Sequence, residues 1–202
     1  MLSFGIIGTN FISDRFMESI NQLPDIQVTA VYSRHSDTGN AFAQKYGIPV
    51  VKTDFSAFCK STAFDCVYIA SPNICHAEQT NALLSAGKHV LCEKPATTDL
   101  DSFRIIKQTA LQSHRVFMEA MRSAYDPAYT VLRNELHRIG TIRRAHFEFC
   151  QYSSRYDQYK NGTILNAFNP ALGNAAVMDI GVYCIYLMLD LFGKPIHVQS
   201  SS

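Results

Sequence analysis

A lysine that directly follows a short apolar run has the clearest potential for chemistry in this sequence. Residues 90–92 are typical of a buried parallel strand, and Glu93, Lys94 and Pro95 come next. Proline lacks the N–H that would continue a strand, so the charged pair is expected at the strand's carboxyl end. Ligands bind at that edge of open α/β sheets, so Lys94 is a candidate for proton transfer. The alternative is a solvated surface pair, which is the commoner state of an isolated Glu-Lys.

Two further polar side chains lie four residues apart in an apolar stretch near the end of the sequence. Asp179 and Tyr183 fall within a helix expected over residues 174–191, so both project from one face. Their neighbours are mainly Val, Ile and Leu, among which polar groups are costly unless they are paired or used. We therefore expect Asp179 and Tyr183 to address one site, the alternative being a helix with a plain polar stripe.

The first expected strand, residues 2–7, runs into a turn suited to a dinucleotide. Such a turn needs a tight bend, close approach of the backbone to a pyrophosphate, and a helix N-terminus that meets the negative charge. Gly8 supplies the bend, Asn10 stands at the second glycine position, and Ser13 is small enough for close packing. A plain strand-to-helix turn is the alternative. The candidate cofactor contacts in this turn are Gly8, Thr9, Asn10, Phe11 and Ile12.

The second expected strand, residues 26–32, ends at Ser33 and Arg34. NAD sites carry an acid near this place for the ribose hydroxyls, whereas an arginine suits the 2′-phosphate of NADP. A serine hydroxyl and a charge-assisted contact from Arg34 therefore favour NADP, with NAD as the other option. In that case Arg34 stacks on the adenine and Asp37 takes the ribose, and the ligand is still a dinucleotide.

Turns after two later strands complete the expected cofactor site. The apolar run 64–70 ends in Ser-Pro-Asn, where the chain must turn at the carboxyl edge of the sheet. A histidine opens the next helix and is expected to have a supporting role. The expected contacts from these turns are Ser71, Asn73, His76, Glu93 and Lys94.

Strands near residues 3, 28, 50, 67, 90 and 116 alternate with helical segments. This pattern predicts an α/β fold, a Rossmann-type doubly wound parallel sheet, over residues 1–120. After it come a helix over 126–138, a half-exposed strand over 145–150 and a long loop over 152–173. Residues 121–202 are therefore expected to form the first part of an α+β substrate and oligomerisation domain, whose largely antiparallel sheet is incomplete.

Composition excludes several classes of function. The 202 residues are 47% hydrophobic and 17% charged with a formal net charge of +1, which offers no footprint for nucleic acid or a membrane surface. The six cysteines show no zinc-binding spacing, so no metal site is expected and the thiols are expected to be reduced. The absence of a signal-like N-terminus favours a cytoplasmic protein.

Three motifs together resemble the Gfo/Idh/MocA family of NAD(P)-dependent oxidoreductases. They are residues 5–8 (Gly-Ile-Ile-Gly), 92–95 (Cys-Glu-Lys-Pro) and 178–183 (Met-Asp-Ile-Gly-Val-Tyr). The resemblance covers essentially the whole chain, with Asn10 departing from the usual glycine. Tyrosine at position 183, where many members carry histidine, is similar to the glucose-fructose oxidoreductase and dimeric dihydrodiol dehydrogenase branch, whose members typically use NADP.

The resemblance implies hydride transfer between NADP(H) and a carbinol or carbonyl carbon of a sugar, inositol or cyclic diol. Lys94 would lie near the nicotinamide and substrate, Asp179 in the substrate pocket, and Tyr183 would act as general acid and base. A free phenol titrates near about 10, and a neighbouring ammonium such as Lys94 favours its ionised form. Family members continue beyond the equivalent of residue 202, so the chain is expected to be partial and the complete protein a homo-oligomer.

A different class of function stays open. Asn10 and the missing histidine also fit a non-catalytic NADP-binding sensor or partner subunit. Three titratable groups converging on one site favour the enzyme, because a pure binder does not need them. The identity of the polyol or sugar substrate depends on the geometry of the 152–173 loop.

Overall fold

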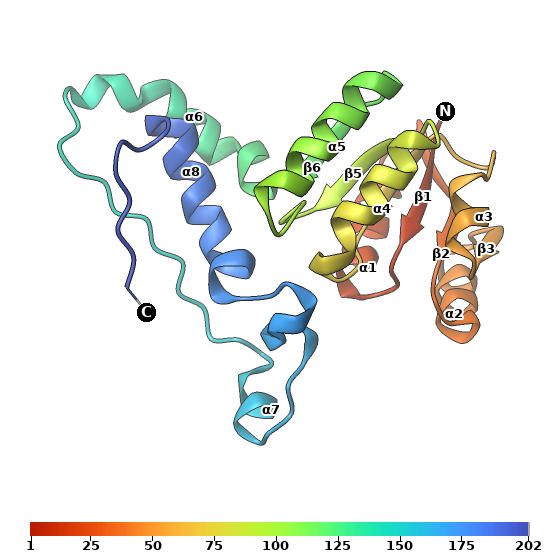
Figure 1. Cartoon of the computed structure of the whole chain (residues 1–202). Coiled ribbons are helices and arrows are strands. Elements are labelled where there is room, and N and C mark those ends of the chain that lie inside the picture. Colours follow the sequence, from red (N-terminus) through yellow and green to blue (C-terminus); the bar gives the residue numbers. More distant parts are fainter. Residues whose placement is uncertain (202) are drawn as a thin grey trace. The chain divides into compact units, whose positions relative to one another are not determined.

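A computed structural model describes residues 1–201 of the chain, which divides into two compact units, Met1–Ala120 and Met121–Ser202. The first unit is built on a single six-stranded sheet in the order β3-β2-β1-β4-β5-β6, with every pair of neighbours parallel (Figure 1). This order reverses between β1 and β4, as in doubly wound sheets. The prediction of a Rossmann-type fold is confirmed. The strands are β1 (Leu2–Ile7), β2 (Ile26–Tyr32), β3 (Val50–Lys52), β4 (Cys66–Ile69), β5 (His89–Glu93) and β6 (Phe117–Ala120).

The helices of the first unit follow the strands in alternation. Local capping explains where two of them begin, because the side chains of Asn10 and Asp54 accept hydrogen bonds from the first-turn amides of α1 and α3. The α2 helix ends at Gly47 in the left-handed conformation that glycine adopts without strain. The helices are α1 (Phe11–Ile20), α2 (Ser36–Tyr46), α3 (Phe55–Cys59), α4 (Asn73–Ser85) and α5 (Leu100–Ser113).

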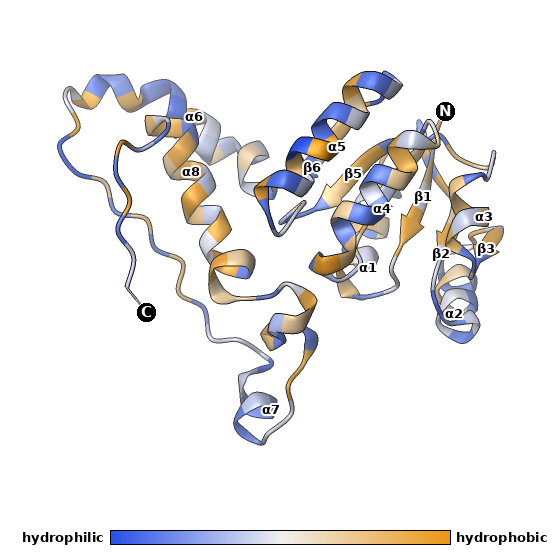
Figure 2. Ribbon diagram, in the orientation of Figure 1, coloured by the Kyte–Doolittle hydropathy of each residue, from blue (hydrophilic) through white to orange (hydrophobic). Residues whose placement is uncertain are grey.

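Two hydrophobic clusters of the first unit take alternate residues of the same strands. In β1, Ile6 belongs to a cluster with Met17 of α1 and Phe42 of α2, whereas Ile7 belongs to a cluster with Leu83 of α4 and Ile106 of α5. Successive side chains of a strand point to opposite faces, so the two clusters lie on the two sides of the sheet. Figure 2 shows the resulting pattern, with strands that are largely hydrophobic and helices of mixed character. The sheet is therefore covered on both faces and presents its strand ends to ligands.

The second unit is helical and irregular in its described part. It contains α6 (Pro127–Glu135), α7 (Tyr156–Lys160) and α8 (Val182–Phe192), with a π-helical turn over Val177–Gly181 that runs directly into α8. Short 3₁₀ turns cover Arg122–Tyr125, Leu136–Ile139, Asn166–Phe168 and Pro170–Leu172. The helix expected over 126–138 is confirmed, with Asp126 as its N-cap and Pro127 in its first turn.

The strand expected over residues 145–150 does not form within the described chain. A strand needs a neighbour to accept and donate its backbone hydrogen bonds, and no strand is present in the described residues 121–201. The apolar side chains of this segment pack on a helix instead, with ring centroids 6.2 Å apart for Phe147 and Phe192 and 5.7 Å apart for Phe149 and Tyr183. The antiparallel sheet predicted for this unit is therefore not observed.

All six cysteines are free thiols, and Cys59, Cys66 and Cys92 are buried. Burial raises the pKa of the Cys92 thiol far above its usual range, so this residue stays protonated and unreactive. Within residues 1–201, every helix is too short or too polar to span a lipid bilayer.

Candidate functional site

The carboxyl ends of four neighbouring strands meet at one edge of the sheet. Ile7 of β1 pairs in register with Ile69 of β4, which pairs with Cys92 of β5, which in turn pairs with Glu119 of β6. The turns that follow these strands therefore begin side by side. Most residues predicted from the sequence to contact a cofactor lie in these turns, at the edge where doubly wound sheets bind ligands.

The turn after β1 brings its backbone close to the end of β4. Gly8 has a φ of 98°, and a Cβ at this position would lie 2.6 Å from the carbonyl oxygen of Ala70, so only glycine fits. The Asn10 side chain donates from Nδ2 to the same oxygen at 2.7 Å and accepts at Oδ1 from the amide of Ile12 at 2.9 Å. Ser13, fully buried, donates its hydroxyl to the Gly8 carbonyl at 2.9 Å. Asn10 thus both caps α1 and fastens the turn to β4.

Arg34 and Ser33 differ sharply in their surroundings. Arg34 is exposed immediately before α2, whose first turn has no side-chain cap. Ser33 is buried, and its Oγ lies 2.7 Å from Oγ1 of Thr38, which donates to the carbonyl of His35 at 3.1 Å. Because Thr38 gives its only hydrogen to that carbonyl, Ser33 must donate to Thr38. The hydroxyl that the sequence analysis assigned to the cofactor is therefore engaged in shaping this turn.

The turn after β4 is held by a buried histidine. Ser71 donates its hydroxyl to Oε1 of Gln79 at 2.6 Å, and Asn73 is the first residue of α4. The ring of His76 is 1% exposed, with Nε2 2.9 Å from the Ser71 carbonyl oxygen and Nδ1 2.8 Å from the Pro95 carbonyl oxygen. His76 therefore links this turn to the one after β5, which is a supporting role of the kind its position suggested.

Glu93 and Lys94 lie at the end of β5, and Lys94 is joined to Pro95 by a cis peptide bond. Glu93 accepts a hydrogen bond from the hydroxyl of Tyr68 at 2.6 Å and one from the backbone amide of Lys94 at 3.3 Å. The carboxylate of Glu93 therefore fixes the backbone at Lys94. The ammonium group of Lys94 is thus carried by a turn attached to a rigid sheet.

Glu119 and Tyr68 were not among the site residues predicted from the sequence. Glu119 accepts a hydrogen bond from the backbone amide of Ala96 at 2.7 Å, although 23 residues separate the two in sequence. The sequence does show Glu119 as a charged residue near the carboxyl end of β6. Glu93 was predicted as a site residue from the same kind of position in β5.

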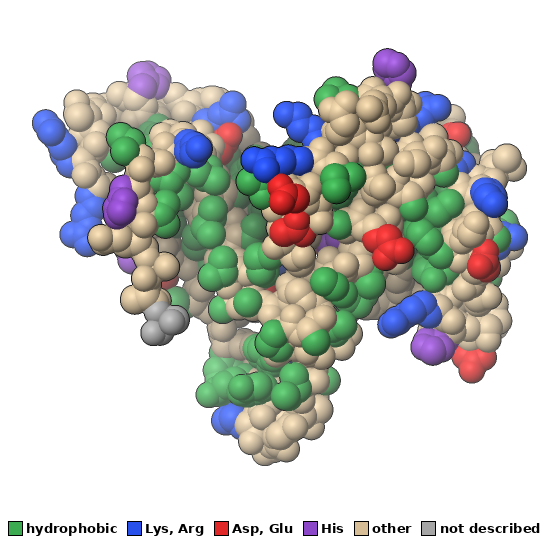
Figure 3. Space-filling model, in the orientation of Figure 1, with side chains coloured by type: hydrophobic (Ala, Val, Ile, Leu, Met, Phe, Trp, Pro, Cys, Tyr) green, Lys and Arg blue, Asp and Glu red, His purple; other side chains and the backbone are tan. Residues whose placement is uncertain are grey.

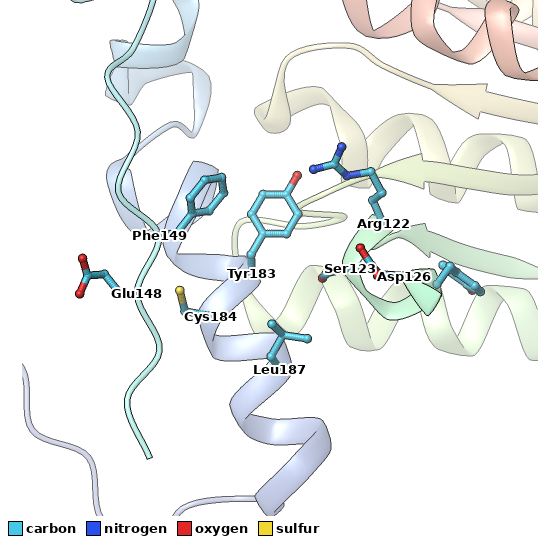
Figure 4. Close-up of a pocket in the computed structure, with 9 residues that line it drawn as sticks. Arg122, Ser123, Asp126, Glu148, Phe149, Tyr183, Cys184 and Leu187 are labelled. Atoms are coloured by element: carbon cyan, nitrogen blue, oxygen red, sulfur yellow. The ribbon is translucent and has the colours of Figure 1, made fainter. Parts of the chain in front are cut away.

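A cavity of about 480 Å³ lies within the second unit and is partly lined by Tyr183. Figure 4 shows the Tyr183 hydroxyl and the Arg122 guanidinium pointing toward one another, with Phe149 packed beside the tyrosine ring. The buried Ser123 hydroxyl, also at this cavity, has no hydrogen-bond partner among the described residues. An aromatic wall with phenol, hydroxyl and guanidinium groups suits a ligand rich in hydroxyl groups.

Asp179, unlike Tyr183, is not among the residues that line this cavity. It falls in the π-helical turn, whereas Tyr183 falls in the α-helix that follows, so the rotation per residue changes between them. The expectation that both side chains project from one α-helical face therefore rested on a regular helix that the chain does not form here.

Among residues 1–201, no group of three or more His, Cys, Asp or Glu side chains is arranged to hold a metal ion. The chemistry available at the described sites is therefore that of Lys94 in the first unit and of Tyr183 with its neighbours in the second.

A parallel sheet with a glycine turn at its switch point defines a dinucleotide-binding fold, and comparison with known proteins gives the family. The family profile described as "Oxidoreductase family, NAD-binding Rossmann fold" matches residues 2–121, and the profile "GFO/IDH/MocA C-terminal domain" matches residues 135–202. The chain belongs to the GFO/IDH/MocA oxidoreductase family, as the three motifs predicted.

Curated relatives match nearly the entire chain. The scyllo-inositol 2-dehydrogenase (NADP(+)) IolU of Bacillus subtilis is 46% identical over 201 residues, which are 100% of this chain and 61% of that protein. The human trans-1,2-dihydrobenzene-1,2-diol dehydrogenase is 30% identical, covering 95% of this chain and 56% of that protein. The chain thus spans about three-fifths of the length of these relatives.

Solved structures share the fold. A 3-ketoreductase mutant from Actinomadura kijaniata, in complex with TDP-benzene and NADP, superimposes with a TM-score of 0.79 at 27% identity, covering 95% of this chain and 57% of that one. An NAD-binding protein from Listeria innocua gives a TM-score of 0.73 at 22% identity, covering 94% of this chain and 54% of that one, which supports the fold alone.

Proposed function

We propose that this chain is part of an NADP(H)-dependent dehydrogenase or reductase that acts on a CH–OH group of an inositol, sugar or cyclic diol. The observation that carries the proposal is Lys94, fixed at the carboxyl edge of a dinucleotide-binding sheet through the Glu93 carboxylate. The substrate class is supported by the relatives, a scyllo-inositol 2-dehydrogenase (NADP(+)) and a trans-1,2-dihydrobenzene-1,2-diol dehydrogenase.

The first unit fits a dinucleotide. The Gly8 turn packs tightly against the end of β4, as the tight bend of a dinucleotide-binding turn requires, and α1 begins shortly after it. Arg34 is exposed two residues before α2, whose N-terminus has no side-chain cap, and both would attract the 2′-phosphate that distinguishes NADP from NAD. When bound, the nicotinamide ring supplies or accepts the hydride.

In this proposal, side chains of the protein transfer the proton to and from the substrate oxygen. Tyr183 would take the proton from the substrate hydroxyl during oxidation and return it to the carbonyl oxygen during reduction. Lys94 would place a positive charge beside the reacting oxygen and stabilise the negative charge that develops there. In this proposal Asp179 orients the substrate hydroxyl or Lys94, and Phe149 and Ser123 form part of the surface that receives the polyol.

The deciding experiment is a screen of the full-length protein for NADPH and NADH turnover with inositols, aldoses, cyclic diols and their ketones. Activity with a polyol or its ketone, preferring NADP(H), is the expected result. Tyr183→Phe should lower kcat by about 10²- to 10⁴-fold, because it removes the general acid and base. Tyr186→Phe, three residues along the same helix, is the matched control and should keep wild-type turnover.

A non-catalytic NADP-binding subunit is the alternative that also fits Asn10 in place of glycine and Tyr183 in place of the usual histidine. It predicts tight NADPH binding with no turnover on any substrate in the panel, and no effect of Tyr183→Phe. That combination of results would replace the enzyme proposal.

A further inference from the structure

The peptide group between Pro95 and Ala96 is contacted at both of its polar atoms by side chains from other elements. The Ala96 N–H donates to Oε1 of Glu119 at 2.7 Å, and the Pro95 carbonyl oxygen lies 2.8 Å from Nδ1 of His76. Both Pro95 and Ala96 are buried, with Ala96 only 3% exposed. This peptide group is one residue beyond Lys94, so whatever holds it also limits how the Lys94 backbone can move.

The sheet itself brings Glu119 to this position. Glu119 of β6 is the registered partner of Cys92 of β5, two residues before Lys94. Cys92 packs in the cluster that contains residues of α4, the helix that also carries His76. The two side chains that hold the peptide group thus come from a neighbouring strand and from a helix packed on the sheet, both of which are rigid elements.

The strand hydrogen bonding of β5 cannot order the chain beyond Lys94. Pro95 has no N–H, so the strand ladder stops, and a buried amide beyond it needs an acceptor from elsewhere. A carboxylate is a stronger acceptor for an amide than a neutral group, and it sets the orientation of the peptide plane as well as its place. Glu93 fixes the peptide group before Lys94 through the Lys94 amide. The peptide group directly before Lys94 and the one that begins at the residue after it are therefore both contacted by side chains.

His76 extends this arrangement to a second turn. Its Nε2 lies 2.9 Å from the carbonyl oxygen of Ser71, so one buried ring spans the turns after β4 and β5. These turns belong to neighbouring strands at the ligand-binding edge of the sheet. The ring therefore lies between the two turns, and in its neutral form it donates to one of the two carbonyl oxygens.

We propose that Glu119 is a positioning residue for Lys94: through the Ala96 amide it holds the turn that places the lysine ammonium against the reacting oxygen. The inference rests on the proposed function for its catalytic consequence. Glu119 touches neither cofactor nor substrate in this role. Its effect should appear in the chemical step and not in the binding of nucleotide.

The test compares Glu119→Ala, Glu119→Gln and Asp65→Ala in the full-length protein. Glu119→Ala should lower kcat by about 10- to 100-fold, since a misplacement of order 1 Å has effects of that size. The dissociation constant of NADPH and the KM for substrate should stay within about threefold, because Glu119 contributes nothing to the binding of either ligand in the ground state. Glu119→Gln keeps an oxygen that accepts the Ala96 hydrogen bond and should recover most of the activity. Asp65→Ala removes a carboxylate that bonds Ser3 at the opposite edge of the sheet and should leave kcat unchanged.

Hydrogen exchange at the Ala96 amide tests the contact without any turnover. Exchange should accelerate in Glu119→Ala, and should stay slow in Glu119→Gln and Asp65→Ala. Unchanged exchange in Glu119→Ala overturns the contact. Accelerated exchange with wild-type kcat overturns the positioning role, and equal loss of kcat in the Gln and Ala variants would make Glu119 a catalytic carboxylate instead. A wild-type protein with no turnover refutes the proposed function. In that case the exchange rates still decide whether Glu119 orders the turn after β5 that carries Lys94.

Discussion

At the scale of single residues, the choice of nucleotide depends on Arg34. Arg34 is exposed two residues before α2, whose first turn has no side-chain cap and carries one acidic residue, Asp37. A 2′-phosphate placed there would meet a bidentate donor and the positive end of a helix dipole. The buried hydroxyl of Ser33 contributes indirectly, by donating to Thr38 and shaping the turn that presents Arg34.

Arg34→Ala should weaken NADPH binding by about 10- to 100-fold, which corresponds to the loss of about 1.5–3 kcal/mol for a charge-assisted contact. NADH binding should change little, because NADH has no 2′-phosphate. Fluorescence titration of both nucleotides at one fixed salt concentration measures the difference. Arg104→Ala, an exposed arginine paired with Asp101 on α5, is the control and should leave both affinities unchanged. Equal affinities of the wild type for NADPH and NADH would contradict the assignment.

Several residue roles could not be predicted because they depend on contacts distant in sequence. The second bond of Asn10 joins it to Ala70, 60 residues away, and Glu119 meets Ala96 across 23 residues. Asn10, which departs from the usual glycine, caps α1 and bonds the residue that follows β4. Only the assembled sheet, which brings the strand ends together, reveals either role.

At the scale of elements, α1 depends on Asn10 for its start. Asn10→Ala removes the acceptor for the Ile12 amide and the bond to Ala70, and should lower the free energy of unfolding by about 1–2 kcal/mol. Urea unfolding followed by circular dichroism measures the change. Asn10→Ser keeps a capping hydroxyl but is too short to maintain both bonds, so an intermediate stability is expected. An alanine variant as stable as the wild type would show that the cap is dispensable.

In the second unit, a partly buried hydrogen bond joins α6 to α8. The Tyr129 hydroxyl donates to Oδ2 of Asp190 at 2.6 Å, and Arg133 lies 3.6 Å from the same oxygen. Burial, together with the bond to Asp190, raises the pKa of Tyr129 to about 12. The protonated phenol is therefore favoured in the folded protein relative to the unfolded chain, where a tyrosine ionises near about 10.

Tyr129→Phe should lower the free energy of unfolding by about 1–2 kcal/mol near neutral pH, because the bond to a carboxylate is lost. Below about pH 10 the phenol of Tyr129 keeps its proton in both the folded and the unfolded chain, so the wild type has the full excess in free energy of unfolding over the variant. Between about pH 10 and 12 the unfolded chain loses the proton first, and the advantage falls as pH rises. Urea unfolding of both proteins at pH 8 and pH 11 tests this sign. A gap between wild type and variant that widens toward pH 11 would be inconsistent with the raised pKa.

The elements of the first unit were predictable because each strand is a short apolar run bounded by glycine, proline or polar residues. Both β1 and β2 have the limits expected from the sequence, whereas β6 lies two residues later than expected, at Phe117–Ala120. The segment 145–150 alternates like a strand but has no strand beside it in the described chain. Alternation reports which side chains face a core, and it cannot report whether a partner strand exists.

At the scale of the whole molecule, the two units differ in how well they cover their apolar side chains. The first unit contains both buried clusters and all six strands. Figure 3 shows hydrophobic side chains at the surface of the second unit around α7 and along α8. Tyr156, Tyr159, Ile185, Leu189 and Phe192 are all at least 40% exposed. Exposed apolar surface of this kind marks regions that contact other protein segments, which is compatible with the homo-oligomer expected from the sequence.

This difference predicts that residues 1–120 fold and bind nucleotide by themselves. The fragment keeps the complete sheet, the Gly8 turn, Arg34 and the bond between Glu119 and Ala96, and it contains every residue predicted to contact the cofactor. It lacks Tyr183 and Asp179, and should therefore bind NADPH without catalysing any turnover. Cooperative thermal unfolding, with NADPH raising the melting temperature more than NADH does, is the expected result. The same fragment carrying Arg34→Ala should lose that difference between nucleotides. A fragment that aggregates, or that melts at the same temperature with and without NADPH, would mean that the second unit helps to build the nucleotide site.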